Sequence, residues 1–400
     1  MKSYVAISSE IDDPVRASKD LANQIRSKGK FEANSVGIVY CDAEVNVAGL
    51  GEQLHKELGI DIAGLTTTAA VERNHGYADM SIHLCVLTAA DAFFTIGFSG
   101  ELGTGEYSGS IHGAYKNAAA KLKDPPKLIL ALTPYIAEHT PGDYVDILDE
   151  AAGGIPIFGG VATDSYDLRF QKTFYNGEEF KRGMVFVLFS GNIRPIFAME
   201  HHFASKADKK GTVTKSEGNK ILRVGDQTFK DYVSTIVPVP DEELVVFHFQ
   251  STPFVVEFPD HEKDDQPVVR VVISVDHSIG AGSFLSRMPE GTVIYLTELQ
   301  RDNLKESCRG ALTDIIGKMA GHSDYEYSML FINTCNARNL LMGDVKTLES
   351  SILSEKLSSL PPAVNAMGFY GFGEICPTGK RANGSAKNRF HNVSFTICAI

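Results

Sequence analysis

The feature that most constrains how this 400-residue chain can fold is a set of segments that recurs three times in the same order. Each copy has a short apolar strand, then a glycine-rich turn with a threonine or an acid, then a second apolar run. The three turns are GLTTTAAVE at Gly64 to Glu72, GGVATDSY at Gly159 to Tyr166 and GFYGFGEICPTG at Gly368 to Gly379. An ordered set of elements rarely repeats by chance, so the recurrence predicts three units of one topology.

Upstream of each turn, two apolar strands alternate with two helical segments. Short β-branched runs between turn residues are typical of buried strands, whereas the segment from Leu304 to Ala320 has apolar residues at helical spacing. The predicted fold class is therefore α/β, with mixed sheets built from repeated βαβαββ units and layered with helices. Within a unit we expect mainly parallel pairing, and a last strand that runs antiparallel and closes a hairpin-like pair. The first strand of the third copy is predicted at Val293 to Thr297.

The length of the chain predicts at least two domains, because one hydrophobic core rarely organises this many residues. A strand-rich segment from about Ala204 to Gly291 separates the second copy from the third, and it contains a predicted hairpin closed at Glu217 to Asn219. Two prolines interrupt the pattern near Val237 to Asp241. We therefore predict an N-terminal domain at 1–237, holding two units and a strand-rich extension, and a C-terminal domain at 238–400, holding the third unit.

The composition argues against several partners and reactions. The net charge is −12 and the acids are dispersed, so no basic face is expected for nucleic acid. No apolar run approaches the roughly twenty residues of a membrane span, and the first residues do not resemble a secretory signal. The six cysteines lie far apart, which predicts free thiols in a reducing cytoplasm. Metal-ligand, nucleophile-elbow and phosphate-loop motifs are missing, so no catalytic or metal residues are predicted.

The third copy carries polar residues without an obvious role in folding. Cys335, Arg338 and Glu349 follow a predicted strand, and the carboxyl ends of parallel strands commonly face a ligand crevice. Arg338 is suited to a carboxylate, but a salt bridge to Glu349 or Glu374 that fixes the helix explains it equally well. Glu374 lies within an apolar stretch, where an unpaired charge costs several kcal/mol. Its partner is predicted to be Arg338 or a cationic amine on a ligand.

Several motifs together resemble the FIST family of bacterial sensory domains. GFYGFGEICPTG followed by RFHNVSFTICAI resembles the C-terminal signature of the family. Cys335, Ala337 and Arg338, and then Glu349, match its Cys-x-x-Arg pattern and its helix acid. In the N-terminal half, GLTTTAAV, TVTKSEGNKIL and GGVATDSY with FYNG at Phe174 to Gly177 resemble further family motifs. The resemblance covers essentially the whole chain.

The resemblance implies a cytoplasmic sensory protein that binds a small ligand, with amino acids or their derivatives as the proposed class. It also implies a separate signalling partner, such as a histidine kinase, a diguanylate cyclase or a chemoreceptor. The missing catalytic motifs predict no enzymatic activity. Some relatives are described as haem proteins, but no axial histidine stands out in this sequence, so no cofactor is expected.

The predicted ligand site lies mainly in the C-terminal half. Its residues are Arg338, Glu374, Cys335 and Tyr370 and, from the equivalent turns of the first two copies, Asp164 and Thr67. One alternative is an enzyme with Cys335 as nucleophile, activated by the following helix and by Arg338. Another is an interaction scaffold without a ligand, in which side chains fill any cavity.

Overall fold

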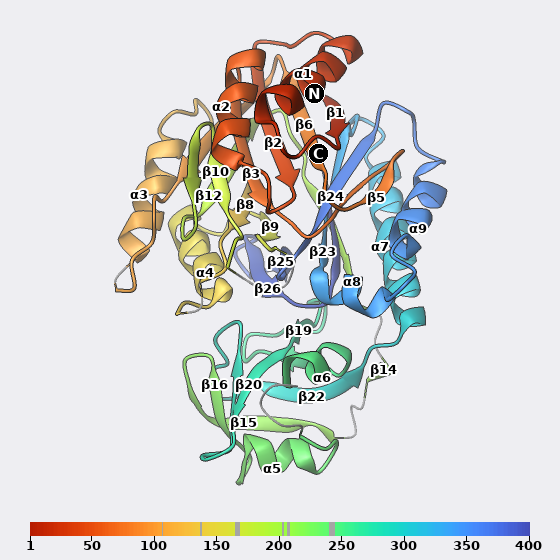
Figure 1. The fold of residues 1–400 in the computed structure, drawn as a ribbon. Coiled ribbons are helices and arrows are strands. Elements are labelled where there is room, and N and C mark those ends of the chain that lie inside the picture. Colours follow the sequence, from red (N-terminus) through yellow and green to blue (C-terminus); the bar gives the residue numbers. More distant parts are fainter. Residues whose placement is uncertain (106, 137, 165–168, 202–203, 206–208, 240–244) are drawn as a thin grey trace.

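The computed structural model describes residues 1–400 except 106, 137, 165–168, 202–203, 206–208 and 240–244. This described part forms a large core, which contains both ends of the sequence, and a smaller lobe drawn in green and teal below it (Figure 1). Three six-stranded sheets lie at the centre of the core, and helices lie outside them. The predicted α/β class, with mixed sheets layered with helices, is confirmed.

The first unit shows the topology that all three share. Its elements are β1 (Lys2–Ser8), α1 (Pro14–Lys28), β2 (Asn34–Cys41), α2 (Val47–Leu58), β3 (Asp61–Thr66) and β6 (Ile82–Ala89). Strands β2 and β3 are parallel, whereas β6 lies between β1 and β2 and is antiparallel to both. The antiparallel last strand is thus confirmed. The expectation of mainly parallel pairing is wrong, because β6 separates β1 from β2 and pairs antiparallel with each of them.

The second and third units repeat this order. The second unit has β7 (Ala92–Phe98), α3 (Ser108–Ala119), β8 (Leu128–Thr133), α4 (Pro141–Ala152), β9 (Ile157–Val161) and β12 (Val185–Gly191). The third has β13 (Ile196–Glu200), α7 (Arg301–Gly321), β23 (Met329–Cys335), α8 (Asn336–Met342), α9 (Leu348–Leu357), β24 (Asn365–Gly371) and β27 (Phe395–Ala399). The prediction of Val293 to Thr297 as the first strand of this unit is wrong. Strand β22 (Val293–Glu298) pairs within the lobe, and β13, an apolar run of similar character, pairs with β27 instead.

A two-stranded hairpin leaves each unit after its third strand and joins the sheet of another unit. The hairpins are β4–β5 (Ala70–Glu72, Gly76–Ala78), β10–β11 (Thr173–Tyr175, Glu178–Phe180) and β25–β26 (Glu374–Lys380, Ala386–His391). They pair with β24, β3 and β9, respectively, so the three sheets are linked in a ring. The predicted closing pair within each unit is therefore wrong, since the third and last strands of a unit lie apart in its sheet.

The recurring glycines lie where the incoming hairpins join the sheets, and Gly159 and Gly368 also lie very close to the backbone of the neighbouring strand in their own unit. Gly64, Gly159 and Gly368 each pair with the second residue of an incoming hairpin strand. Gly159 has a φ of 145°, and a Cβ atom there would lie 1.9 Å from the Ala131 carbonyl oxygen. Only glycine allows such a close approach of two backbones.

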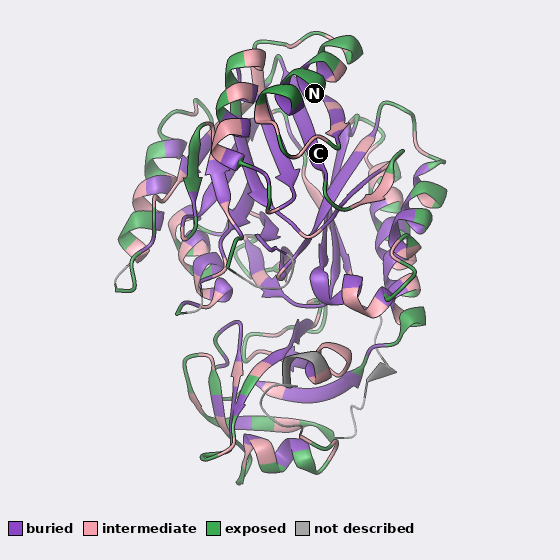
Figure 2. Cartoon of the chain, in the orientation of Figure 1, coloured by how far each residue is buried: buried purple, intermediate pink, exposed green. Residues whose placement is uncertain are grey.

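The inner faces of the three sheets share one apolar core. It contains, for example, Ile38 from the first unit, Val187 from the second and Phe331 from the third. Separate apolar clusters lie between the sheets and their outer helices. Figure 2 shows that the central strands are almost entirely buried, whereas the helices are exposed on their outer sides.

The lobe is inserted between β13 and α7 of the third unit. It contains β14 (Ala204–Ser205), β15 (Gly211–Glu217), β16 (Lys220–Val224), β17 (Gln227–Thr228), α5 (Phe229–Ser234), α6 (Val245–Ser251), β18 (Phe254–Glu257), β19 (Val268–Arg270), β20 (Val272–Asp276), β21 (Ala281–Phe284) and β22. The predicted hairpin is confirmed, because β15 pairs with β16 and Gly218 in its turn has a φ of 60°. The predicted boundary at Val237 to Asp241, of which 240 and 241 lie outside the described residues, falls between strands of this one sheet.

Candidate functional site

Arg338 lies in the first turn of α8, just after β23, and is fully buried. Its Nε and Nη2 atoms lie 2.8 and 2.7 Å from Oε1 of Glu349 in α9, which makes a buried ion pair. The guanidinium also donates to the Ser307 hydroxyl (2.8 Å) and to the carbonyl oxygens of Leu304 (3.1 Å) and Val393 (3.2 Å). Protein acceptors therefore satisfy Arg338, and its partner is Glu349, one of the two acids that the sequence left open.

Tyr370 belongs to the same buried network. Glu349 Oε2 accepts hydrogen bonds from the hydroxyl groups of Tyr370 (3.1 Å) and Thr334 (3.2 Å). Burial raises the pKa of the Tyr370 phenol well above its usual range. Arg338 and Tyr370 thus hold α8, α9 and β24 together.

Glu374 and Cys335 form a second buried pair. Glu374 Oε2 accepts the backbone N–H of Ser394 (3.0 Å), while Oε1 has no conventional hydrogen-bond partner among the described residues. Burial raises the pKa of Glu374 well above its usual range, against the opposing effects of that N–H and of the Cys335 thiol. Arg338, the internal partner predicted for Glu374, pairs with Glu349 instead. Burial and the Glu374 carboxyl also raise the pKa of Cys335, which argues against a thiolate nucleophile there.

Thr67 and Asp164 fix the turns of the first two units. Thr67 Oγ1 donates to the carbonyl oxygen of Tyr370 (2.9 Å), which ties the first unit to the third. Asp164 Oδ2 accepts the backbone N–H groups of Arg169 and Phe170, both at 2.8 Å. Residues 165–168, between these groups, lie outside the described part of the chain. The structure therefore ties Thr67 to the third unit through the Tyr370 backbone. It also brings the Asp164 turn against the first turn, because Thr68 Oγ1 donates to the carbonyl oxygen of Asp164 (2.6 Å).

Of the six predicted site residues, Cys335 lines a cavity, and that cavity is small. It has a volume of about 40 Å³ and lies between α8, Phe372 and the lobe residues Val271 and Leu285. Such a volume holds about one water molecule. The ligand-binding role of the six residues stays a prediction, and the larger cavities are found elsewhere in the molecule.

A cavity of about 340 Å³ lies between the core and the lobe. It is lined by α4, by loops and strands of the lobe, and by β26. The residues that give it its chemistry are Asp146, Phe258, Arg270, Arg287, Arg389 and Phe390. We call this cavity the Arg270 pocket.

Arg270 is the unusual member of this pocket. It ends β19 and is 1 % exposed, yet it forms no ion pair with any described residue. Its Nη1 donates to the carbonyl oxygens of Val269 (3.1 Å) and Phe390, and its Nε has no hydrogen-bond partner in the described part of the chain. Burial and the neighbouring Arg389 lower the pKa of Arg270 to about 9, so the guanidinium is still charged at neutral pH. A buried charge without a partner is costly, which points to an anion as the missing partner.

Asp146 of α4 brings an unpaired negative charge to the same pocket. It is exposed to water, and no hydrogen bond or ion pair to its carboxylate is found among the described residues. Desolvation by the surrounding protein raises the pKa of Asp146, while Arg389, Arg287 and Arg270 oppose that rise. The pocket therefore offers one unpaired cation and one unpaired anion.

The remaining charged residues of the pocket are already paired. Arg389 Nη2 lies 2.5 Å from Asp260 Oδ2, and Arg287 Nε lies 2.7 Å from Asp143 Oδ1. The guanidinium groups of Arg389 and Arg270 both lie over the ring of Phe258, at 5.3 and 5.7 Å from its centre. The contact with the Phe258 ring helps to hold the Arg270 guanidinium in place.

Two family models together match most of the chain. The FIST N domain matches residues 35–227, and the FIST C domain matches residues 227–377. The chain belongs to the FIST family. FIST domains are sensory domains, which agrees with the resemblance seen in the sequence.

Individual relatives of this FIST chain add little. Uncharacterized protein MJ1623 of Methanocaldococcus jannaschii is 24 % identical over 266 residues, which are 60 % of this chain and 48 % of that protein. The chain thus spans about half the length of this curated relative. The solved structure of T. maritima PurL complexed with FGAR matches over 100 % of this chain and 73 % of that one, at 10 % identity and a TM-score of 0.20. This TM-score is too low to indicate a shared fold.

The Arg270 pocket of this FIST protein was missed by sequence reasoning. Arg270 is a charged residue inside the apolar run VVRVV, just as Glu374 is a charged residue inside an apolar stretch. Arg389 lies in the basic stretch from Lys380 to Arg389, which also carries glycine, serine and asparagine as exposed loops do. A charged residue inside a predicted strand was the available signal.

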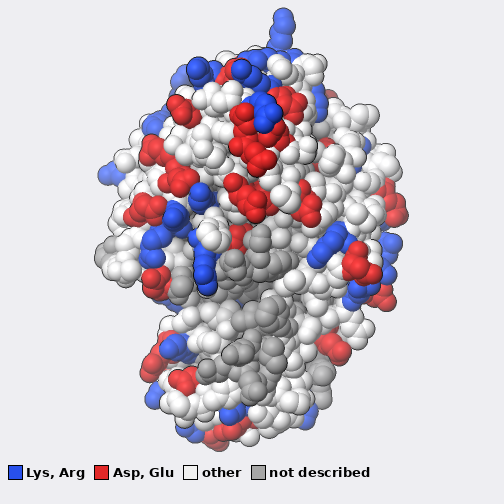
Figure 3. All heavy atoms as spheres, viewed as in Figure 1, with Lys and Arg blue, Asp and Glu red and all other residues white. Residues whose placement is uncertain are grey.

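Among the described residues, no helix has both the length and the apolar character needed to span a bilayer. The same residues contain no group of three or more His, Cys, Asp or Glu side chains placed to hold a metal ion. On the face drawn in Figure 3, basic and acidic side chains are interspersed.

Proposed function

We propose that this FIST protein is a sensory protein that binds an amino-acid-like ligand in the Arg270 pocket. The observation that carries the proposal is an unpaired buried guanidinium, Arg270, in the same cavity as an unpaired carboxylate, Asp146. A guanidinium matches a carboxylate through parallel hydrogen bonds, and a carboxylate matches an ammonium group. An α-amino acid carries both groups on one carbon atom.

The size and walls of the pocket fit such a ligand. Its volume of about 340 Å³ is at the lower end of the range for small-molecule sites. Phe258 and Phe390 provide apolar surface for a side chain. No histidine, cysteine, tyrosine or methionine lines the described pocket, so its donor set does not fit haem and we propose no cofactor there.

The position of the pocket suggests how binding is reported. Asp146 belongs to the core, Arg270 belongs to the lobe, and Arg389 belongs to the hairpin between them. A ligand that contacts all three holds the lobe against the core. We propose that a separate cytoplasmic partner, such as a histidine kinase, a diguanylate cyclase or a chemoreceptor, responds to this change.

Thermal unfolding of the full chain with a panel of amino acids tests the proposal. A ligand at one hundred times its dissociation constant adds about 2.7 kcal/mol of stability. An amino acid that stabilises the protein should lose its effect when its amino group is acetylated, and also when its carboxyl group is esterified. Equal stabilisation by the blocked compounds contradicts the proposal, as does a panel without any effect.

Two matched variants test the residues. Asp146→Asn should weaken binding by about tenfold or more, which corresponds to 1.4 kcal/mol. Glu150→Gln removes the same charge from an exposed position of the same helix and should leave binding unchanged. Equal affinity in the two variants would remove Asp146 from the site.

A further inference from the structure

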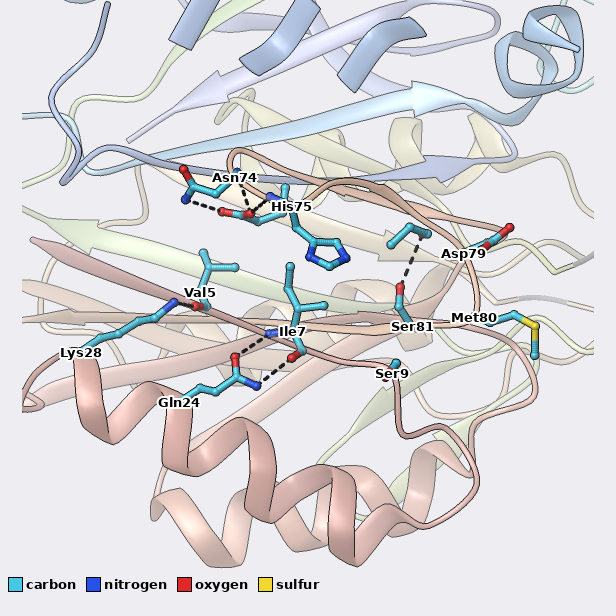
Figure 4. A pocket seen from close by; sticks show the side chains of 12 residues that line it. Val5, Ile7, Ser9, Gln24, Lys28, Asn74, His75, Asp79, Met80 and Ser81 are labelled. Carbon is cyan, nitrogen blue, oxygen red and sulfur yellow. Dashed lines mark hydrogen bonds between the residues drawn. The ribbon is translucent and has the colours of Figure 1, made fainter. Parts of the chain in front are cut away.

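A second cavity, of about 470 Å³, lies between edge strand β1, helix α1 and the hairpin β4–β5 of the first unit (Figure 4). Ile7 forms one wall, and Glu72 and Ala78 of the hairpin form another. The side chain of His75 lies between the hairpin and Ile7. We call this cavity the His75 groove.

The strand register shows which residue of the second unit is equivalent to Ile7 of the groove. The comparison starts from the recurring glycines Gly64 and Gly159, which are followed by Leu65 in the first unit and by Gly160 in the second. Pairing across the first sheet leads from Leu65 through Tyr40 and His83 to Ile7. The same steps across the second sheet lead from Gly160 to Phe98, so Ile7 and Phe98 occupy the same place.

The hairpins extend this equivalence. Each begins with a residue that pairs with the third strand of another unit: Ala70 in the first unit and Thr173 in the second. Ala78 pairs with Ala70 as Phe180 pairs with Thr173. Two positions after Ala70 and Thr173 stand Glu72 and Tyr175, respectively.

In the second unit, aromatic rings fill this place. The ring of Phe98 stacks on Tyr175 at 5.0 Å between centres and on Phe180 at 5.7 Å, with 21° between the planes in both cases. In the first unit, Glu72 and Ala78 replace the two outer rings, and the His75 groove is the space that remains. The chain itself thus shows what fits at this position of the fold: stacked planar rings.

The polar contacts of the groove exclude a peptide strand as occupant. Gln24 bonds to the backbone N–H (3.2 Å) and carbonyl oxygen (2.7 Å) of Ile7, and Lys28 donates to the carbonyl oxygen of Val5 (Figure 4). These side chains occupy the edge of β1 that an added strand would need. The Glu72 carboxylate accepts the backbone N–H of His75 (2.7 Å) and is also engaged.

The side chains of the groove that are still available include those of His75 and Asp79. The imidazole of His75 and the carboxylate of Asp79 make no hydrogen bond or ion pair with another residue in the described part of the chain. Imidazole can stack on a planar ring or exchange a hydrogen bond with it, and a carboxylate accepts ring or exocyclic N–H groups. We infer that the His75 groove binds a planar heteroaromatic molecule with N–H donors, of about the size of a nucleobase. This site is independent of the Arg270 pocket.

Saturation-transfer NMR on the full chain with adenine as probe tests the inference, with the uncharged saturated ring of cyclohexanol as the control. Adenine should receive saturation and cyclohexanol should not. Ala78→Phe, which copies the ring of the second unit into a half-buried position, should weaken adenine binding by about tenfold or more, while Ala78→Ser should not. Equal binding of adenine by these two variants, or no binding of adenine by the natural chain, would overturn the inference.

A second variant covers the case that Ala78→Phe disturbs folding, which thermal unfolding detects. Asp79→Ala changes an exposed side chain and removes the proposed acceptor for N–H groups. It should weaken adenine binding and leave the amino-acid response of the Arg270 pocket intact. Unchanged adenine affinity in Asp79→Ala would remove the carboxylate from the site and contradict the proposed ligand class.

Discussion

Replacing Arg338 by methionine should destabilise the protein strongly. Arg338 and Glu349 are 0 % and 2 % exposed, so the change leaves a buried carboxylate without its counter-ion. Removing one partner of a buried pair typically costs about 3 to 5 kcal/mol of unfolding free energy. The hydroxyl groups of Tyr370 and Thr334 still bond to Glu349, which favours the lower half of that range.

A double variant separates the charge from the packing. In Arg338→Met with Glu349→Leu, no charge is left buried, and most of the lost stability should return because apolar residues of similar volume replace ion pairs at little cost. The exposed pair Arg26–Glu57, whose nitrogen and oxygen lie 3.3 Å apart, provides a control. Arg26→Met should cost at most about 1 kcal/mol.

Urea unfolding followed by far-UV circular dichroism measures these differences, since the chain contains no tryptophan. A shift of the midpoint at constant slope reports stability. The structural interpretation of Arg338 would be refuted if Arg338→Met were as stable as the natural chain but lost its response to amino acids. It would also fail if the double variant were no more stable than the single one.

Two further predictions concern Glu374 and the recurring glycines. Because burial raises the folded-state pKa of Glu374, the natural chain should lose stability as pH rises above the unfolded pKa, by at most about 1.4 kcal/mol per pH unit. Glu374→Gln should therefore gain stability relative to the natural chain as the pH rises above about 4.5, the ordinary pKa of a glutamate side chain. Equal pH profiles of the two proteins would contradict a buried carboxyl. Gly159→Ala should cost about 2 to 6 kcal/mol, because its Cβ meets the Ala131 carbonyl oxygen at a φ of 145°. Gly153→Ala, with a φ of 64° but open space around it, should cost only about 1 kcal/mol in thermal unfolding, and equal losses would show that the close approach is unimportant.

Local signals in the sequence predicted the elements of the fold well. The turn at Glu217 to Asn219 was found because strand patterns flank a short turn with a glycine, and the helix of Leu304 to Ala320 because its apolar residues recur at helical spacing. The partner of each strand was not predictable in the same way. The segments Ile196–Glu200 and Val293–Glu298 are both apolar runs, and only their pairing shows that the first belongs to the core and the second to the lobe.

The predicted site residues illustrate the same limit. The buried charge of Glu374 was expected from its apolar surroundings, but the sequence could not decide which acid Arg338 meets. In the structure, α9 brings Glu349 against it, and Glu374 is left beside Cys335.

The amino-acid sequence by itself determined that the protein has three α/β units, that a glycine-rich turn recurs in each of them, and that the chain is a member of the FIST family. Repeats, secondary-structure propensities and motifs depend on residues that are close together along the chain, so they can be recognised in a single sequence. Only the tertiary structure decided that the hairpins pass from unit to unit and that Asp146, Phe258, Arg270 and Arg389 surround one cavity. These residues are far apart along the chain and meet because the lobe packs against the core, which depends on long-range packing that no local pattern encodes.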